Sequence, residues 1–222
     1  MKEVLRFEEI DYVIRYPEDF SKDSKYPLVI YLHGAGGRGR DINIAFNHLF
    51  FSQSEPFCKE AVTVVPQCYA NTWFDIYEQL QRFIKGMIDA EYVDAMRVYV
   101  IGASMGGYTT WQMAMSHPEW FAAAVPICGG GMYWNAERLK NMGIWAFHGS
   151  DDTTVYCDES KKMVEKINNK YGGNARLTIY EGVKHDSWTA TFTDPEVWKW
   201  LFSNTNHYQE TENKYNDVVK FG

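Results

Sequence analysis

The sequence predicts an α/β fold built on one mostly parallel sheet with helices on both faces. Short apolar runs alternate with longer segments of helical periodicity, which is the pattern of successive strand–helix units. Most of the apolar runs are continuous, as expected for strands that helices cover on both faces. With 222 residues, 45% of them hydrophobic, the chain can form one well-buried core but not two full domains.

Seven segments are expected to form strands: Tyr12–Tyr16, Leu28–His33, Val62–Pro66, Val98–Ile101, Ala123–Ile127, Ile144–His148 and Leu177–Tyr180. Apolar spacing and helix stops predict four helices, Asp75–Tyr92, Ser104–His117, Tyr156–Tyr171 and Pro195–Phe202. After that the chain turns polar. We therefore expect a folded domain over residues 1–203 and a polar tail over 204–222 that carries a small apolar patch at Val218–Phe221.

The composition bounds the possible partners. The formal net charge is -7 and basic residues form no run, so nucleic acid is not an expected partner. No apolar stretch typical of a secretory signal or a membrane span is visible, which leads us to expect a cytoplasmic protein without a membrane partner. The four cysteines have no metal-ligand spacing, and we expect reduced thiols. The sequence does not indicate an oligomeric state.

The strongest motif for chemistry is the segment from Gly102 to Gly106, Gly-Ala-Ser-Met-Gly. It follows a predicted strand and precedes a predicted helix, which is the context that a G-x-S-x-G nucleophile requires. A tight turn there projects the hydroxyl of Ser104 above the edge of the sheet, and glycine two positions to either side avoids collision with the neighbouring strand and helix. We therefore predict that Ser104 is a nucleophile.

The loop after the strand Leu28–His33 allows two interpretations. Gly34, Gly36 and Gly39 match a G-x-G-x-x-G dinucleotide fingerprint, but that fingerprint needs an acid at the end of the next strand, where this chain has Val-Pro-Gln. The alternative is an H-G-x-G loop that supplies one N–H of an oxyanion hole, the other coming from the residue after the nucleophile. We favour this second interpretation, because the nucleophile lies downstream, and it assigns the two N–H groups to Ala35 and Met105.

In this arrangement the acid and the base follow the serine in the order acid, then histidine. Asp151 and Asp152 compete for the acid position after the strand Ile144–His148, and we favour Asp152 because it lies deeper in the loop. His185 is the expected base, because it follows the last strand. The other downstream histidine, His207, falls in the polar tail. Together these residues complete a nucleophile, base and orienting acid.

The chain carries several short motifs in a fixed order: His33-Gly-Ala-Gly-Gly, Pro66-Gln67-Cys68, Gly102-Ala-Ser-Met-Gly-Gly, Pro126-Ile-Cys-Gly-Gly130, His148-Gly-x-x-Asp152-x-x-Val155 and His185-Asp-Ser-Trp188. In this order they resemble the motifs of the phospholipase/carboxylesterase and dienelactone-hydrolase-like esterases of the α/β-hydrolase superfamily. The group is also similar to feruloyl and acetylxylan esterase domains and to the prolyl-oligopeptidase hydrolase domain. The resemblance implies an α/β-hydrolase catalytic domain that hydrolyses esters through an acyl-enzyme without a cofactor or metal, and it independently points to Asp152.

About fifteen residues separate the strands Ala123–Ile127 and Ile144–His148, so we expect no large lid and an open cleft. Candidate substrate-binding residues are Trp188, Gln67, Trp73 and Trp134, with core packing as the alternative for each tryptophan. The expected partner is a small-molecule ester with a short acyl group or a carbohydrate or aromatic component. A serine peptidase or thioesterase with the same three residues, and a non-catalytic binding protein of this fold, are the rival interpretations.

Overall fold

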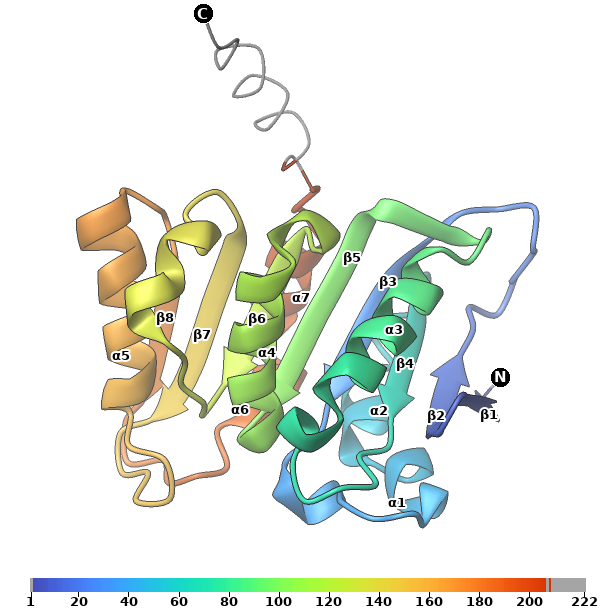
Figure 1. Cartoon of the computed structure of the whole chain (residues 1–222), viewed down its shortest axis with the longest axis horizontal. Helices are drawn as coiled ribbons and strands as arrows, with labels where there is room; N and C mark the ends of the chain where they lie inside the picture. The colour runs from blue at the N-terminus through green and yellow to red at the C-terminus, as the bar shows by residue number, and fades with distance from the viewer. Residues whose placement is uncertain (1, 207, 209–222) are drawn as a thin grey trace, which may run out of the picture.

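The computed structural model of the chain describes residues 2–206 and 208. Its centre is an eight-stranded sheet in the order β1-β2-β4-β3-β5-β6-β7-β8 (Figure 1). The strands are β1 (Lys2–Phe7), β2 (Ile10–Arg15), β3 (Tyr26–Leu32), β4 (Val62–Pro66), β5 (Val93–Ala103), β6 (Ala123–Ile127), β7 (Gly143–Gly149) and β8 (Arg176–Tyr180). Only the pairs β1–β2 and β2–β4 are antiparallel, so the sheet is mostly parallel, as predicted.

Helices cover both faces of this sheet. The α-helices are α1 (Ile42–Phe46), α2 (Leu49–Ser54), α3 (Tyr77–Ile88), α4 (Met105–Ser116), α5 (Asp158–Glu165), α6 (Trp188–Thr193) and α7 (Pro195–Phe202). Shorter turns are η1 (Ala35–Gly37), η2 (Trp73–Ile76), η3 (Pro118–Trp120), η4 (Tyr133–Leu139) and the π-helical η5 (Lys166–Lys170). In Figure 1 α3, α4 and α5 lie in front of the sheet and α7 lies behind it.

The two faces of the sheet carry two separate hydrophobic cores. β3 shows the division: Leu28, Ile30 and Leu32 pack with α3, α4 and α5 on one face, whereas Val29 and Tyr31 pack with α2, α6 and α7 on the other. Successive side chains of a strand point to opposite faces, so a strand with helices on both sides must be apolar throughout. The continuous apolar runs of the sequence therefore have a direct structural cause.

All seven predicted strands are present, and β4, β6 and α7 have the predicted bounds. The sequence pattern missed β1, because this edge strand carries the charged residues Lys2, Glu3 and Arg6 and is largely exposed. It also missed α1, α2 and α6, which have six residues or fewer and too little length for a helical period to emerge. Of the polar tail predicted for 204–222, the patch Val218–Phe221 lies outside the described residues.

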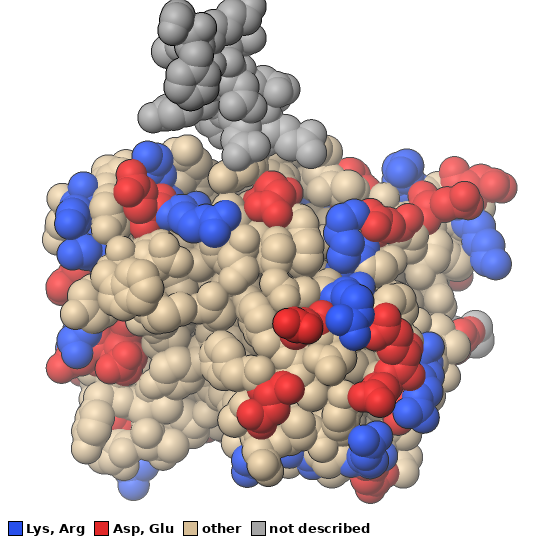
Figure 2. Space-filling model, in the orientation of Figure 1, with Lys and Arg blue, Asp and Glu red and all other residues tan. Residues whose placement is uncertain are grey.

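Three general expectations from the composition concern the distribution of charge, the state of the cysteines and the apolarity of the helices. On the face drawn in Figure 2, acidic and basic side chains are interspersed. All four cysteines are free, and Cys58, Cys68 and Cys128 are buried. Among residues 2–206 and 208, none of the helices combines the length and the apolarity that crossing a bilayer requires.

The turn from β5 into α4 depends on very close backbone contacts. Gly106, in the first turn of α4, lies so close to the carbonyl of Leu32 that a Cβ atom there would clash with it. A Cβ on Gly102 would likewise meet the backbone of Gly106. The two outer glycines of the G-x-S-x-G motif therefore allow β3, β5 and α4 to approach one another, as the sequence predicts.

The loop after β3 is fixed by His33, which is buried. The Nδ1–H of His33 donates to the carbonyl of Gly34 at 2.8 Å, and Nε2 accepts the backbone N–H of Cys68 at 3.1 Å. The indole N–H of Trp73 donates to the carbonyl of His33 at 3.0 Å. Burial lowers the pKa of His33 to about 4, which keeps the ring neutral and preserves these bonds.

We predict that Gly106→Ala destabilises the protein strongly. The new methyl group meets backbone atoms, which cannot rotate away as a side chain can, so the cost should reach about 3 kcal/mol. This corresponds to a melting temperature lowered by about 6–12 °C in differential scanning calorimetry. Gly36→Ala is the matched control, because nothing lies within 4 Å of a Cβ there. Equal melting temperatures for the two variants would contradict the steric argument.

We also predict that stability falls as the pH decreases from about 6.5 toward 4, in part through His33. In the folded protein the pKa of His33 is about 4, below the ordinary value of 6.5, so in this window the unfolded chain binds a proton that the folded one does not. His33→Gln should flatten the dependence of the unfolding free energy on pH by up to about 1.4 kcal/mol per pH unit. Urea denaturation at a series of pH values measures this slope, and an unchanged slope would refute the assignment.

Candidate active site

Ser104 lies where the sequence predicts it, between the last residue of β5 and the first residue of α4. Its backbone has φ 57° and ψ −116°, a conformation that non-glycine residues rarely adopt. The backbone N–H of Ser104 donates to the carbonyl of Ile127 at 2.9 Å, which ties the strained turn to β6. The hydroxyl oxygen lies 2.9 Å from Nε2 of His185.

His185 follows β8 and connects Ser104 to the acid. Its Nδ1 lies 2.7 Å from Oδ2 of Asp152. An ionised carboxylate can only accept hydrogen bonds, so Nδ1 carries the proton and Nε2 presents its lone pair to the hydroxyl of Ser104. The side chain of His185 is 24% exposed, and so the ring borders both the interior and the solvent. The geometry is that of a base in contact with a hydroxyl nucleophile.

Asp152, not Asp151, is the carboxylate that meets the histidine. Asp152 is 3% exposed, and its Oδ1 accepts the backbone N–H groups of Thr154 and Val155, each at 2.9 Å. Burial alone would raise the pKa of Asp152, but the hydrogen bonds from His185, Val155 and Thr154 outweigh it and lower the pKa. Asp151 is exposed and accepts a hydrogen bond from Ser150.

A second imidazole, that of the buried His148, also approaches Asp152. Its Nε2 lies 2.9 Å from the carbonyl of Val155 and 3.3 Å from Oδ2 of Asp152, while Nδ1 lies 2.8 Å from Oγ of Ser160. A carbonyl only accepts, so the proton is on Nε2 and is donated to Val155, while the carboxylate of Asp152 lies at the longer distance. From the sequence we expect His148 only to form a local hydrogen bond that shapes its loop. The one sequence signal for a position beside the acid is its spacing of four residues from Asp152 in the motif.

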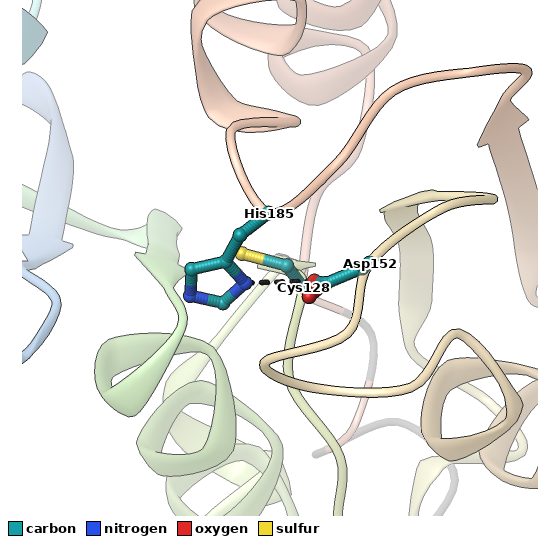
Figure 3. Close-up of side chains that lie close together, drawn as sticks. All are labelled: Cys128, Asp152 and His185. Atoms are coloured by element: carbon teal, nitrogen blue, oxygen red, sulfur yellow. Dashed lines mark hydrogen bonds and ion pairs between the residues drawn. The ribbon is translucent and has the colours of Figure 1, made fainter.

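Cys128 completes the group that Figure 3 shows. Its sulfur, an oxygen of Asp152 and a nitrogen of His185 lie within 4.8 Å of one another, which is close enough for metal ligands (Figure 3). Burial, however, raises the pKa of the Cys128 thiol to about 12, and metals bind the thiolate. Asp152 and His185 already share a hydrogen bond. These donors therefore fit a proton relay better than a cation.

The N–H groups predicted for an oxyanion hole come from Ala35 and Met105. Each residue is the first of a helical turn, η1 and α4 respectively, and the first N–H groups of a helix have no acceptor within it. The loop is close to the nucleophile, since a Cβ on Gly34 would lie 3.4 Å from Cβ of Ser104. Ala35 lines the same cleft as Ser104, and Met105 is the next residue after the serine, so the positions of both residues are compatible with the predicted role.

A cleft of about 460 Å³ lies over these groups. Of the predicted site residues, Ser104, His185, Ala35 and Trp188 line it. The indole of Trp188 meets the ring of His185 edge to face, with centroids 5.5 Å apart. Among the lining residues that the sequence does not assign to the site are Ile44 of α1, His48 between α1 and α2, and Leu49 of α2. These two helices are too short for a helical period to define a face toward the cleft.

The other three candidate substrate-binding residues do not line this cleft. Trp73 is fully buried under His33, with which it shares a hydrogen bond, and thus takes the core-packing alternative. Gln67 is buried too, and its amide donates to the carbonyl of Gly37, so it braces the loop from behind. Trp134 is 65% exposed on η4, where the hydroxyl of Tyr171 donates to its carbonyl. We therefore assign support of the loop, not substrate contact, to Trp73 and Gln67.

Comparison with known proteins gives consistent likenesses. The sequence pattern of the prolyl oligopeptidase family matches residues 69–131. Over 126 residues the chain is 31% identical to the poly(3-hydroxyalkanoate) depolymerase C of Paucimonas lemoignei, a match that covers 40% of this chain and 30% of the depolymerase. A thermostable esterase of known structure is 34% identical with a TM-score of 0.82, and the match covers 92% of this chain and 63% of the esterase.

A ferulic acid esterase is 16% identical with a TM-score of 0.66, over 90% of this chain and 98% of that one, and shows a likeness of fold alone.

The chain spans less than two thirds of the length of the depolymerase and of the thermostable esterase. The sheet order, the strand–serine–helix turn and these likenesses agree on one conclusion. The chain has the α/β-hydrolase fold.

Proposed function

We propose that the chain is a serine carboxylesterase in which Ser104, His185 and Asp152 form a catalytic triad. The observation that carries this proposal is the continuous chain of hydrogen bonds from the hydroxyl of Ser104 through His185 to Asp152, at 2.9 and 2.7 Å. It opens onto a cleft that Ser104 and His185 line. The likeness to a thermostable esterase supports the same reaction class.

In the first half of the reaction, Oγ of Ser104 attacks the carbonyl carbon of the ester while Nε2 of His185 takes the hydroxyl proton. The carbonyl oxygen becomes an anion, which the N–H groups of Ala35 and Met105 stabilise; one such donor is worth about 10²–10³ in rate. Asp152 remains ionised and stabilises the imidazolium. When the tetrahedral intermediate collapses, the C–O bond breaks and the alcohol leaves with the proton from Nε2.

In the second half, water replaces the alcohol. His185 takes a proton from the water, whose oxygen attacks the acyl carbon on Ser104. The second tetrahedral intermediate collapses to the carboxylic acid and the free serine, and Nε2 returns the proton to Oγ. The low pKa of Asp152 keeps its carboxylate charged through both halves, so that the imidazole stays in the productive tautomer.

The cleft supports short-chain or carbohydrate- and aromatic-linked esters as substrates. η4, the segment between β6 and β7, packs on α4, α5 and η5, so no lid from this segment closes over Ser104. Ile44 and Leu49 line the cleft and are 38% and 37% exposed, which leaves its rim open to solvent. An open rim admits a bulky alcohol, and Trp188 offers an aromatic surface for it.

A serine peptidase is the second candidate, because the prolyl oligopeptidase pattern matches residues 69–131, which include the nucleophile turn. The lining of the cleft favours an ester. Among the described residues that line it, none is Asp, Glu, Lys or Arg. A peptide whose charged terminus entered this cleft would leave that charge unpaired. A thioester would undergo the same chemistry as an ester, and assays must distinguish the two.

We predict that the wild-type protein hydrolyses p-nitrophenyl esters and favours acetate and butyrate over octanoate. Ser104→Ala should lower kcat by at least about 10⁴-fold with little change in melting temperature, because only the attacking atom is lost. Acetylated and feruloylated oligosaccharides, a thioester and a short peptide complete the panel, with initial rates as the measurement. Wild-type protein that leaves every ester intact would end the esterase proposal, and cleavage of the peptide alone would establish the rival.

We predict that Asp152→Asn lowers kcat by about 10⁴-fold, because the amide can hold His185 in the wrong tautomer. Asp151→Asn is the matched control: the carboxylate of Asp151 is exposed and does not contact His185 in any hydrogen bond or ion pair described, so kcat should not change. Residues that act as a unit are non-additive, so Ser104→Ala combined with Asp152→Asn should be no slower than Ser104→Ala alone. The opposite ranking of the two aspartate variants would show that the acid has been misassigned.

A further inference from the structure

A second histidine, His48, borders the cleft, and the proposed mechanism does not use it. His48 connects α1 to α2 and is the residue that caps the N-terminus of α2. Its ring packs against that of Tyr31, with centroids 5.0 Å apart, and both residues line the cleft together with Ser104 and His185. An imidazole therefore lies in the same concavity as the reacting groups.

The cap fixes which nitrogen of His48 carries the proton. The backbone N–H of Phe50 donates to Nδ1 of His48 at 3.1 Å, so Nδ1 presents a lone pair. A neutral imidazole that accepts through Nδ1 carries its proton on Nε2. Burial, with a smaller effect of His33, lowers the pKa of His48 to about 4. Above that pH the ring is therefore a neutral donor with a fixed tautomer.

The Nε2–H group of His48 has no hydrogen-bond partner among residues 2–206 and 208. The Nε2 atom of His48 is not fully buried. In this it differs from the indole nitrogen of Trp111, which is buried and has no hydrogen-bond partner either. The ring lines the cleft, which is thus the open space described beside this N–H group. A bound molecule can supply the acceptor that the described part of the chain does not.

We propose that His48 determines specificity: its Nε2–H donates a hydrogen bond to a second oxygen of the ester, apart from the scissile group. Ile44 and Leu49 lie beside it and contact the carbon skeleton of the same part of the substrate. The substrate class is thus an ester whose acyl or alcohol part carries an ether, hydroxyl or carbonyl oxygen, in preference to a plain alkyl ester. This inference rests on the proposed esterase function.

Pairs of substrates in which one methylene is replaced by oxygen test the proposal. On the acyl side, the p-nitrophenyl esters of ethoxyacetic and 3-methoxypropanoic acid are compared with that of pentanoic acid. On the alcohol side, 2-methoxyethyl acetate is compared with butyl acetate. Each kcat/KM is divided by the rate constant of alkaline hydrolysis of the same ester, which removes intrinsic reactivity. Wild-type protein should prefer at least one oxygen-bearing member by about threefold to tenfold, the range that one hydrogen bond provides.

Two variants separate the N–H of His48 from its cap. In His48→Asn the amide oxygen can take the place of Nδ1 and keep the cap, but nothing replaces Nε2. In His48→Gln the amide nitrogen can reach the place of Nε2, whereas the short-range cap is lost. His48→Asn should lose the preference at an unchanged melting temperature, and His48→Gln should keep much of it while melting a few degrees lower.

Leu49→Ala is the matched control. It shortens the apolar wall without touching the N–H, so it should lower kcat/KM for both members of a pair by the same factor. Hydrolysis of the alkyl esters without any preference for oxygen in the wild type would overturn the role of His48 and leave the esterase function intact. A preference that survives in His48→Asn would overturn it as well. Failure to hydrolyse any ester would remove the esterase function and this inference together.

Discussion

The contact between the backbone of Gly106 and the carbonyl of Leu32 is the constraint on which the rest of the site depends. It lets the first turn of α4 lie directly against the end of β3, while Gly102 leaves room for the same turn from the side of β5. With any side chain at these positions, α4 would move away from the sheet. Ser104 would then leave its strained position, and the loop that carries Ala35 would no longer lie beside it.

The parallel sheet then gathers residues that are far apart in the sequence. Ser104 follows β5, Asp152 follows β7 and His185 follows β8, so all three lie beyond the carboxyl ends of parallel strands. Cys128 follows β6, the strand that lies between β5 and β7 in the sheet. Its sulfur lies within 4.8 Å of Asp152 and His185. Because the strands are buried on both faces, this edge is where polar side chains can meet without being enclosed by apolar ones.

Much of this arrangement could be predicted from the sequence, because it depends on strong local signals. Continuous apolar strands, a glycine–serine turn and the positions of Asp152 and His185 after strands identified the sheet and brought the three residues to one edge. The distal parts of the cleft could not be predicted. α1 and α2 are too short for a helical period, so no pattern places Ile44, His48 and Leu49 in a cleft. Trp73 and Gln67 could either support the loop or contact substrate, and only the structure shows that both are buried and support the loop.

Four histidines around the site show how the hydrogen-bond partners of each ring determine its chemistry. His33 donates through Nδ1 to a carbonyl and accepts an N–H at Nε2, which leaves it only a structural use. In His148 a carbonyl holds the proton on Nε2, whereas in His185 the carboxylate draws it to Nδ1 and frees Nε2 for the serine. His48 accepts at Nδ1, so its proton is on Nε2, and the residue lines the cleft. Because each tautomer is imposed by a backbone group or a carboxylate, one fold can place a neutral donor and a base in the same cleft.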